Sequence, residues 1–337
     1  MTNQLLAQET IPAGEAAYID DLGARLQAKI MRDNAGGIMR RDAHPKMHGL
    51  VKAEFTVEAN LPQELRVGVF AEPKTYQAWI RFSNQDGTIG PDSGRDIRGM
   101  AIKLMGVPGE KLLAQEKDAQ TQDFIVISTD RFVTADVEQF DALIKAFTSS
   151  LLAKAWFGLT HLRVLWNLFL SMRRFANPLQ IRYFSTTPYL LGSQAVKYSA
   201  IPHVTDADAI PADPGPDYLR EAMLRQLATG EAHFDFAVQL QTDARSMPIE
   251  DPGVAWSEQA SPFRKVASIR IMSQQFDSPA QRQFGENMSF TPWHSLPQHR
   301  PLGGINRARK VVYAAISTFR HQANGTVRAE PAGWDIK

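Results

Sequence analysis

Cysteine is absent from the 337 residues of the chain. This absence excludes disulfides, thiolate metal sites, iron–sulfur clusters held by thiolates and cysteine nucleophiles. An excess of charge is also absent, because 37 lysines and arginines stand against 36 acidic residues and the formal net charge is +1. A chain with this balance has no general attraction to nucleic acid. We therefore predict no nucleic-acid partner and expect any functional positive charge to be local.

Targeting signals and long hydrophobic runs are scarce as well. The N-terminus MTNQLLAQETIPAGEAAYIDD has no basic segment followed by an apolar one, which predicts a cytoplasmic protein. The most apolar stretch, at 151–170, is interrupted by Lys154, His161 and Arg163, so it does not predict a transmembrane helix. We expect it to pack on the body of the protein, with a peripheral contact to lipid as the alternative.

Several common catalytic motifs are missing. The patterns GxGxxG, GxxxxGK[ST], HExxH and GxSxG do not occur. The sequence therefore lacks the motifs that usually predict a nucleotide-binding protein, a zincin or a serine hydrolase. What the composition offers instead is 44% hydrophobic and 22% charged residues, the profile of a globular protein with a substantial core.

Segments with strand character form an early and a late group. The predicted strands are 49–57, 76–83, 98–106, 123–129, 195–202, 233–241 and 266–272. Helices are predicted at 14–32, within 136–175, at 217–229 and at 307–321. Because the strands are grouped rather than alternating with helices, we predict an antiparallel α+β fold in which the strands could close a barrel.

Two arginines and a tyrosine lie at helical spacing near the C-terminal end of the chain. In RKVVYAAISTFR, Arg309 precedes Tyr313 by four residues and Arg320 follows it by seven, so all three share one face of a helix. A nearby positive charge favours the ionised form of a phenol, and an axial tyrosine on haem iron is the ligand of catalase. The structural alternative is an amphipathic surface helix whose arginines reach into solvent.

Three other segments carry polar residues beside predicted strands. RDAHPKMHGL contains Arg41 and His44, RFSNQDG contains Arg81 and Ser83, and RDIRGMAIK covers 95–103. Taken singly, each has a structural explanation, because a histidine at a strand start is commonly a structural residue and arginines at strand ends are commonly solvated or paired. Their joint occurrence in this order is more informative than any one of them.

Together with the Arg-Tyr-Arg spacing, these segments resemble the haem-dependent catalase superfamily, in particular its compact catalase-related peroxidases. The resemblance covers about residues 38–325 and implies an antiparallel, about eight-stranded β-barrel core with surrounding helices. It leaves 1–37 as an N-terminal arm and helix and 326–337 as a C-terminal tail. It also implies haem b as the cofactor, with its iron bound by Tyr313.

The resemblance implies roles for residues on both sides of the haem. The family's Arg-x-x-His-x-Lys matches Arg41, as a propionate-binding arginine, and His44, as the distal histidine. Its Arg-Phe-Ser matches Arg81, a second propionate contact, and Ser83, which orients the distal imidazole. The family's Arg-Asp-x-Arg-Gly matches Arg95, Asp96, Arg98 and Gly99. Its axial segment, an arginine, the axial tyrosine and a second arginine, matches Arg309, Tyr313 and Arg320.

The chain departs from the pattern of true catalases at the distal asparagine. Where that amide precedes a hydrophobic strand, this sequence reads TQDFIVIST, and the place is held by Thr121 or Gln122. Bulky Met47 and His48 also replace the family's small-residue run after the distal histidine. We therefore predict that disproportionation of hydrogen peroxide is slow relative to one-electron or organic-hydroperoxide chemistry.

The resemblance implies a haem peroxidase that reduces hydrogen peroxide or organic hydroperoxides with an unidentified reductant and has weak catalase activity. One alternative is an enzyme that rearranges fatty-acid hydroperoxides, like an allene oxide synthase or lyase, with the same axial tyrosine and no reductant. Another is a non-catalytic haem- or lipid-binding barrel in which His44 is structural. A monomer or a homodimer is expected.

Overall fold

The computed structural model describes residues 5–336, so the first four residues of the predicted N-terminal arm and the last residue of the predicted tail lie outside it. The β-strands of the described range are β1 Met47–Val57, β2 Thr75–Asn84, β3 Arg98–Met105, β4 Thr121–Ile127, β5 Tyr183–Phe184, β6 Tyr189–Leu191, β7 Gln194–Pro202, β8 Ala232–Leu240 and β9 Arg264–Ile271. Its α-helices are α1 Glu15–Asp33, α2 Val137–Thr148, α3 Leu151–Thr160, α4 Leu162–Ser171, α5 Tyr218–Thr229, α6 Pro279–Asn287 and α7 Gly304–Ala323.

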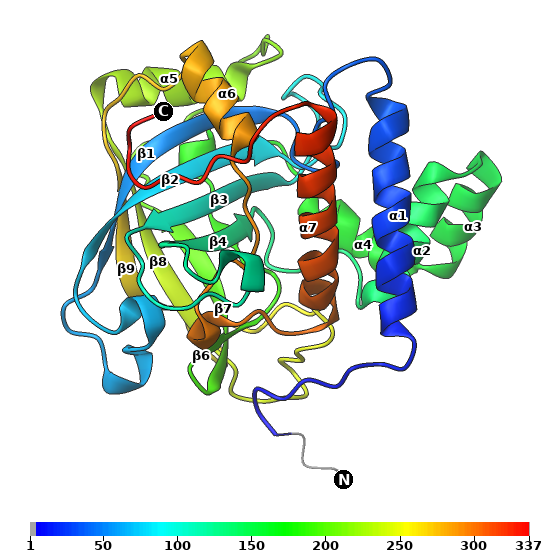
Figure 1. The fold of residues 1–337 in the computed structure, drawn as a ribbon, viewed down its shortest axis with the longest axis horizontal. Coiled ribbons are helices and arrows are strands. Elements are labelled where there is room, and N and C mark those ends of the chain that lie inside the picture. The colour runs from blue at the N-terminus through cyan, green and yellow to red at the C-terminus, as the bar shows by residue number, and fades with distance from the viewer. Residues whose placement is uncertain (1–4, 337) are drawn as a thin grey trace.

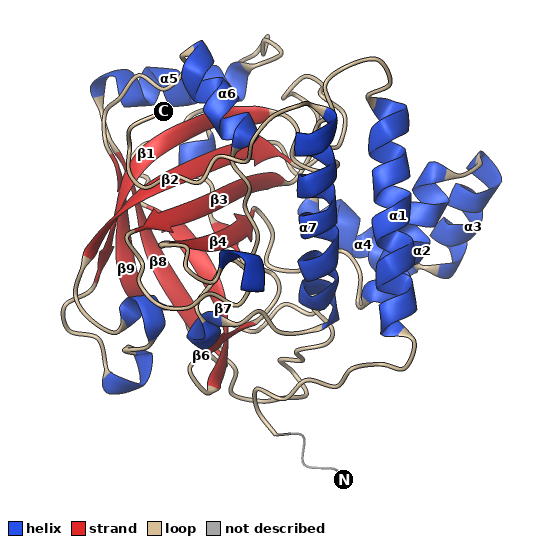
Figure 2. Ribbon diagram, in the orientation of Figure 1, coloured by secondary structure: helices blue, strands red, loops and turns tan. Residues whose placement is uncertain are grey.

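The strands form one antiparallel sheet that closes on itself. Their order is β5-β4-β3-β2-β1-β9-β8-β7-β6, and β5 also pairs with β7, with Tyr183 opposite Ala200 and Phe184 opposite Ser199. Eight strands therefore close a barrel, and β6 lies outside the closure in a hairpin with β7. Figure 2 shows the barrel with helices around it. This confirms the predicted α+β fold with an eight-stranded antiparallel barrel and surrounding helices.

The seven predicted strands are all present, with ends displaced by at most two residues. The helical region predicted within 136–175 consists of three helices, because Asp136 and Ser150 cap two separate helix starts by accepting hydrogen bonds from Gln139 N and Ala153 N. The sequence analysis missed α6 and the short strands β5 and β6. A strand of two residues, such as β5, is too short to show an alternating pattern.

Aromatic side chains fill the barrel interior. Phe55, Phe124, Tyr198 and Phe236 are buried and come from β1, β4, β7 and β8. The ring centroid of Phe236 lies 4.9 Å from that of Phe124 and 5.2 Å from that of Phe55. An eight-stranded barrel is just wide enough for its own side chains to fill. The interior is thus a packed core, and the polar residues singled out from the sequence lie around it.

Helix α7 stands beside the barrel, between the strands and α1 (Figure 1). Its residues Ile305, Ala308 and Val312 form one apolar cluster with residues of α1 and α2. Near its start, Arg307 forms ion pairs with Glu9 at 2.6 Å, Glu15 at 2.6 Å and Glu250 at 2.8 Å. These contacts attach α7 to the N-terminal segment and fix its position.

Helices α3 and α4 continue from α2, and α3 lies at the edge of the molecule, across α1 from the barrel, in the view of Figure 1. Over residues 5–336, no helix has the length and apolar character needed to cross a membrane. The stretch 151–170 thus forms two short helices, joined at His161.

Replacing a core aromatic tests the role of the filled barrel. We expect Phe236→Ala to lower the free energy of unfolding by about 3–5 kcal/mol, because it removes buried surface and leaves a cavity. The matched control is Phe147→Ala, at an exposed position of α2, which should change it by less than about 1 kcal/mol. Urea denaturation followed by circular dichroism measures both. Equal effects of the two variants would contradict this account of the core.

Candidate functional site

His44 lies just before β1, in a backbone conformation that is unusual for a histidine. Its φ is +63°, in the left-handed region that few side chains other than glycine adopt. Its backbone N–H donates to Gln85 O at 3.2 Å and its carbonyl accepts from Arg81 at 2.9 Å. The Nδ1 atom lies 3.0 Å from Ser83 Oγ. Both the backbone and the imidazole of His44 are therefore held by β2 and the residue that follows it.

Gly99 provides the space for the imidazole. It pairs with Ser83 across β2 and β3. A Cβ atom at position 99 would lie 2.7 Å from Nδ1 and Cε1 of His44 and 3.0 Å from Ser83 Oγ. Since real Cβ atoms do not come so close, any larger residue would displace the ring. This contact explains why the segment RDIRG needs its glycine.

Burial and neighbouring cations keep His44 neutral. Burial, together with the charges of Arg81, Arg309 and Arg41, lowers its pKa to about 3. A neutral imidazole has one nitrogen that can accept a proton. Arg309 lies on α7, so a charge of that helix contributes to the field around His44.

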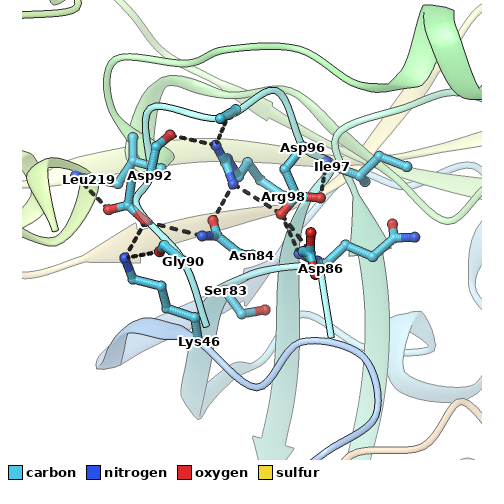
Figure 3. Close-up of polar contacts among 12 residues, drawn as sticks. Lys46, Ser83, Asn84, Asp86, Gly90, Asp92, Asp96, Ile97, Arg98 and Leu219 are labelled. Atoms are coloured by element: carbon cyan, nitrogen blue, oxygen red, sulfur yellow. Dashed lines mark hydrogen bonds and ion pairs between the residues drawn. The ribbon is translucent and has the colours of Figure 1, made fainter. Parts of the chain in front are cut away.

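A buried polar network supports the β2 and β3 ends that carry Ser83 and Gly99 (Figure 3). Arg98 donates to Asn84 and pairs with Asp96 at 3.1 Å. Asn84 donates to Asp92 at 3.1 Å, and Asp92 pairs with Lys46 at 2.8 Å. A buried network of hydrogen bonds and ion pairs holds its members in fixed positions. Lys46 and Arg98, matched from the sequence to family patterns, thus support the site from behind rather than lining it.

Three arginines from distant parts of the chain converge on one carboxylate, that of Glu286 in α6. Arg41 pairs with it at 2.7 Å, Arg81 at 3.4 Å and Arg320 at 3.9 Å. Arg41 also donates to backbone carbonyls at the end of α6, and Arg320 donates to Glu286 O at 2.8 Å. We call Arg41, Arg81, Arg320 and Glu286 the arginine cluster. Arg41 and Arg81, which the resemblance assigned to propionates, therefore lie together with Arg320 of the axial segment.

The arginine cluster carries more positive than negative charge. Burial and the charge of Arg41 lower the pKa of Arg81 to about 9 and that of Arg320 to about 10, so both remain protonated at neutral pH. Three cations thus surround one carboxylate. Within residues 5–336, the buried Nε of Arg81 has no hydrogen-bond partner. The cluster has the charge and a free donor to accept a further anion.

Sequence reasoning missed Glu286. The segment SPAQRQFGEN was not predicted as a helix, although serine followed by proline is a common helix start. In the structure Ser278 caps α6 by accepting a hydrogen bond from Gln281 N. That start signal could have located α6, but nothing in the sequence shows that its last turn meets three arginines.

On α7, Arg309 contacts Tyr313 as the helical spacing predicts. Its Nε donates to the phenol oxygen at 3.3 Å, its guanidinium lies 5.1 Å from the ring centroid, and it also donates to Asn306 at 3.1 Å. Arg320 instead joins the arginine cluster through Glu286. The two arginines that flank Tyr313 in sequence therefore have different partners.

The structure does not bring Thr121 and Gln122 to His44. Gly99 pairs with Ile127 at the end of β4, whereas Thr121 pairs with Met105 at its start. Six residues of strand separate these ends, which is about 20 Å. The hydroxyl of Thr121 contacts His294 and Glu330, and Gln122 accepts from Leu296 N at 2.8 Å. Both residues have structural partners away from the imidazole.

No protein-family model matches the sequence, and a search of curated proteins finds no match. The fold, however, is that of catalases. A fungal catalase superposes with a TM-score of 0.65 and 16% identity over 98% of this chain and 66% of its own. Catalase A from Saccharomyces cerevisiae superposes with a TM-score of 0.70 and 17% identity, over 100% of this chain and 72% of its own. A bacterial catalase superposes with a TM-score of 0.64 and 15% identity, over 93% of this chain and 63% of its own.

The chain therefore spans about two thirds of the length of these catalases. The likeness confirms the expected catalase-like fold and agrees with the closed eight-stranded barrel. At this level of identity it shows the fold alone, so the chemistry of the site has to be argued from the residues themselves.

The support behind Ser83 and Gly99 can be tested at Arg98. Arg98→Ala should lower the free energy of unfolding by about 3–5 kcal/mol, because it leaves buried polar partners uncompensated. Arg95→Ala is the matched control from the same segment, since Arg95 is exposed and donates to the carbonyls of Met172 and Phe169. Its effect should stay below about 1 kcal/mol. A small effect of Arg98→Ala in urea denaturation would contradict a supporting role of the network.

Proposed function

We propose that the chain is a haem-dependent oxidoreductase that reduces hydrogen peroxide or organic hydroperoxides and has weak catalase activity. The observation that carries the proposal is the convergence of three groups on one site. These groups are a neutral His44 held by Ser83, a tyrosine held by Arg309, and the arginine cluster. The catalase-like fold supports it independently.

The residues present fit haem b. Arg41, Arg81 and Arg320 would hold its propionates, since the arginine cluster has an excess of two positive charges over Glu286 and an unpaired buried donor. Charge-assisted contacts with carboxylates suit guanidinium groups. The phenol oxygen of Tyr313 would be the protein ligand of the iron. When bound, the haem supplies the iron that exchanges electrons with peroxide.

His44 would act as the acid–base group. Its neutral imidazole can take a proton from a hydroperoxide and return it to the departing oxygen. Ser83 holds Nδ1 and so orients the ring, and Gly99 leaves the ring its place. Because the pKa of His44 is about 3, the imidazole stays ready to accept a proton well below neutral pH. Reduction of the hydroperoxide to an alcohol and water consumes two electrons and two protons, and an external reductant must supply the electrons.

The distal pocket would favour reduction over disproportionation. The sequence assigned the place of the distal amide to Thr121 or Gln122, and both lie at the other end of β4. Without that amide beside His44, a second peroxide molecule is not positioned for oxidation. The proposal therefore keeps the peroxidase reaction as the main activity and the catalase reaction as a minor one.

Absorption spectra and turnover of reconstituted protein test the proposal. Wild-type protein should bind haem with a Soret band, and Tyr313→Phe should change the ferric spectrum because it removes the ligand oxygen. Tyr218→Phe, a tyrosine that donates to Phe175 O elsewhere, is the control. His44→Ala should keep haem and lose about 10²–10⁴-fold in turnover. Wild-type turnover should show no histidine titration between about pH 5 and pH 8, because His44 is already neutral there.

Each contrary outcome has a definite meaning. The absence of a Soret band after reconstitution would contradict the proposal that haem is the cofactor. Turnover unaffected by His44→Ala would leave a haem-binding barrel without this catalytic role. Isomeric products formed from a fatty-acid hydroperoxide without any reductant would favour the rearranging enzyme, and rapid oxygen release from hydrogen peroxide would favour a true catalase.

Glu286 offers a separate test at the propionate side. Its pKa is lowered by Arg41, Arg81 and Arg320 against the opposing effect of burial, so it is ionised and repels an incoming carboxylate. We expect Glu286→Gln to raise haem affinity by at least about fivefold, since about 1 kcal/mol of repulsion is removed. The control is Glu330→Gln, an equally exposed carboxylate paired with Lys103. Titration of the Soret band measures both variants. Weaker haem binding by Glu286→Gln would contradict net repulsion and show that holding the three arginines together is the larger effect of Glu286.

A further inference from the structure

Helices α3 and α4 both present large apolar side chains to solvent. In α3, Leu151 and Leu152 are each 83% exposed, Trp156 is 70% and Leu159 is 73%. In α4, Leu162, Trp166 and Phe169 are each more than half exposed. Large exposed apolar patches mark interaction sites in folded proteins. We call these seven side chains the α3–α4 face.

The α3–α4 face follows from the helical spacing of its residues. In α3, positions 151, 152, 156 and 159 share one side of the helix, and in α4 positions 162, 166 and 169 do. The opposite sides are buried, through Phe157 in α3 and through Val164 and Asn167 in α4. Both helices are thus amphipathic, with their buried sides packed and the larger apolar stripe directed outward.

Charge identifies what can cover this face. No aspartate or glutamate occurs between Asp141 and Asp206. The segment carries Lys154, Arg173 and Arg174 at exposed positions, and within the described chain none of the three is paired with a carboxylate. Arg163 is paired with Asp251 at 2.8 Å. Lys154 therefore lies in α3 itself, and Arg173 and Arg174 come shortly after α4 in the chain, without a paired carboxylate in the described residues.

We propose that the α3–α4 face docks on the surface of an anionic lipid membrane. Leucine, tryptophan and phenylalanine on one side of a helix, with lysine and arginine beside them, are the features of helices that lie in the membrane interface. Each cation near an anionic surface adds to the attraction. The two tryptophans suit the headgroup region, where the apolar ring and its N–H both find partners.

A second copy of the chain fits this surface less well. A twofold interface pairs the same patch on both subunits, so the unpaired cations Lys154, Arg173 and Arg174 would approach their own symmetry mates. Like charges at an interface oppose association. An anionic lipid surface supplies the missing negative charge, so the membrane is the occupant that the charges favour.

Membrane docking would bring the protein to a surface that can contain peroxidised lipid, a substrate of the proposed class. This consequence rests on the proposed function, whereas docking itself does not. Lipid binding is therefore measured without peroxide or reductant, so that its failure and the failure of the peroxidase proposal can be told apart.

Vesicle co-sedimentation of the full-length protein tests the docking. Wild type should bind phosphatidylcholine vesicles that contain phosphatidylglycerol, bind vesicles of phosphatidylcholine alone more weakly, and shift its tryptophan emission to the blue. The double variant Trp156→Glu/Trp166→Glu should bind at least about tenfold more weakly, because two interfacial rings are lost. Lys154→Gln should weaken binding to the anionic vesicles by about fivefold.

The matched control is Ile11→Glu/Val327→Glu, which adds the same two charges at exposed apolar positions elsewhere. It should bind as wild type does, and circular dichroism checks that every variant is folded. Absence of wild-type binding to anionic vesicles at low salt would overturn the proposal, as would equal losses in the two double variants. Sedimentation velocity tests whether a second copy of the chain occupies the α3–α4 face instead. A dimer abolished by Trp156→Glu/Trp166→Glu, without vesicle binding, would assign the face to a second copy.

Discussion

The convergence of Arg41, Arg81 and Arg320 on Glu286 is the interaction on which the site depends. It joins the segment before β1, strand β2, helix α6 and helix α7, which lie up to about 280 residues apart in the chain. Three like charges would otherwise repel one another in a half-buried place. Glu286 makes their proximity tolerable and yet leaves an excess of positive charge, so the same contact both assembles the site and keeps it receptive to an anion.

Burial and nearby positive charge together keep His44 neutral. Arg81, Arg309 and Arg41 all lower the pKa of His44, and burial acts in the same direction. An imidazole in this field cannot hold a proton permanently, which is the property required of a group that must accept and then release one. The cations that would hold the cofactor thus also prepare the residue that would act on its substrate.

The fold and part of the site could be predicted from the sequence. The strands from 49 to 272 show clear alternation and turn boundaries, and the spacing of Arg309 and Tyr313 led directly to their contact in α7. Local patterns do not reveal which distant segments meet, so Glu286 was missed. Thr121 and Gln122 were assigned from a linear match, but the antiparallel pairing of β3 with β4 places them at the other strand end. The pairing register of β3 with β4, not the type of residue, keeps Thr121 and Gln122 away from His44.

The way the barrel closes has a consequence for how the protein is made. Strand β1 pairs with β9, so that Glu54 meets Arg270, and α7 follows only after that. Contacts of such long sequence separation form slowly, and a domain is completed only when its last partner strand is present. A ribosome-bound chain that has extended past β4 already carries Arg41, His44, Arg81 and Ser83, but it has neither Glu286 nor Tyr313. The proposed haem site is therefore complete only after α6 and α7 have been synthesised, and a shorter nascent chain lacks part of it.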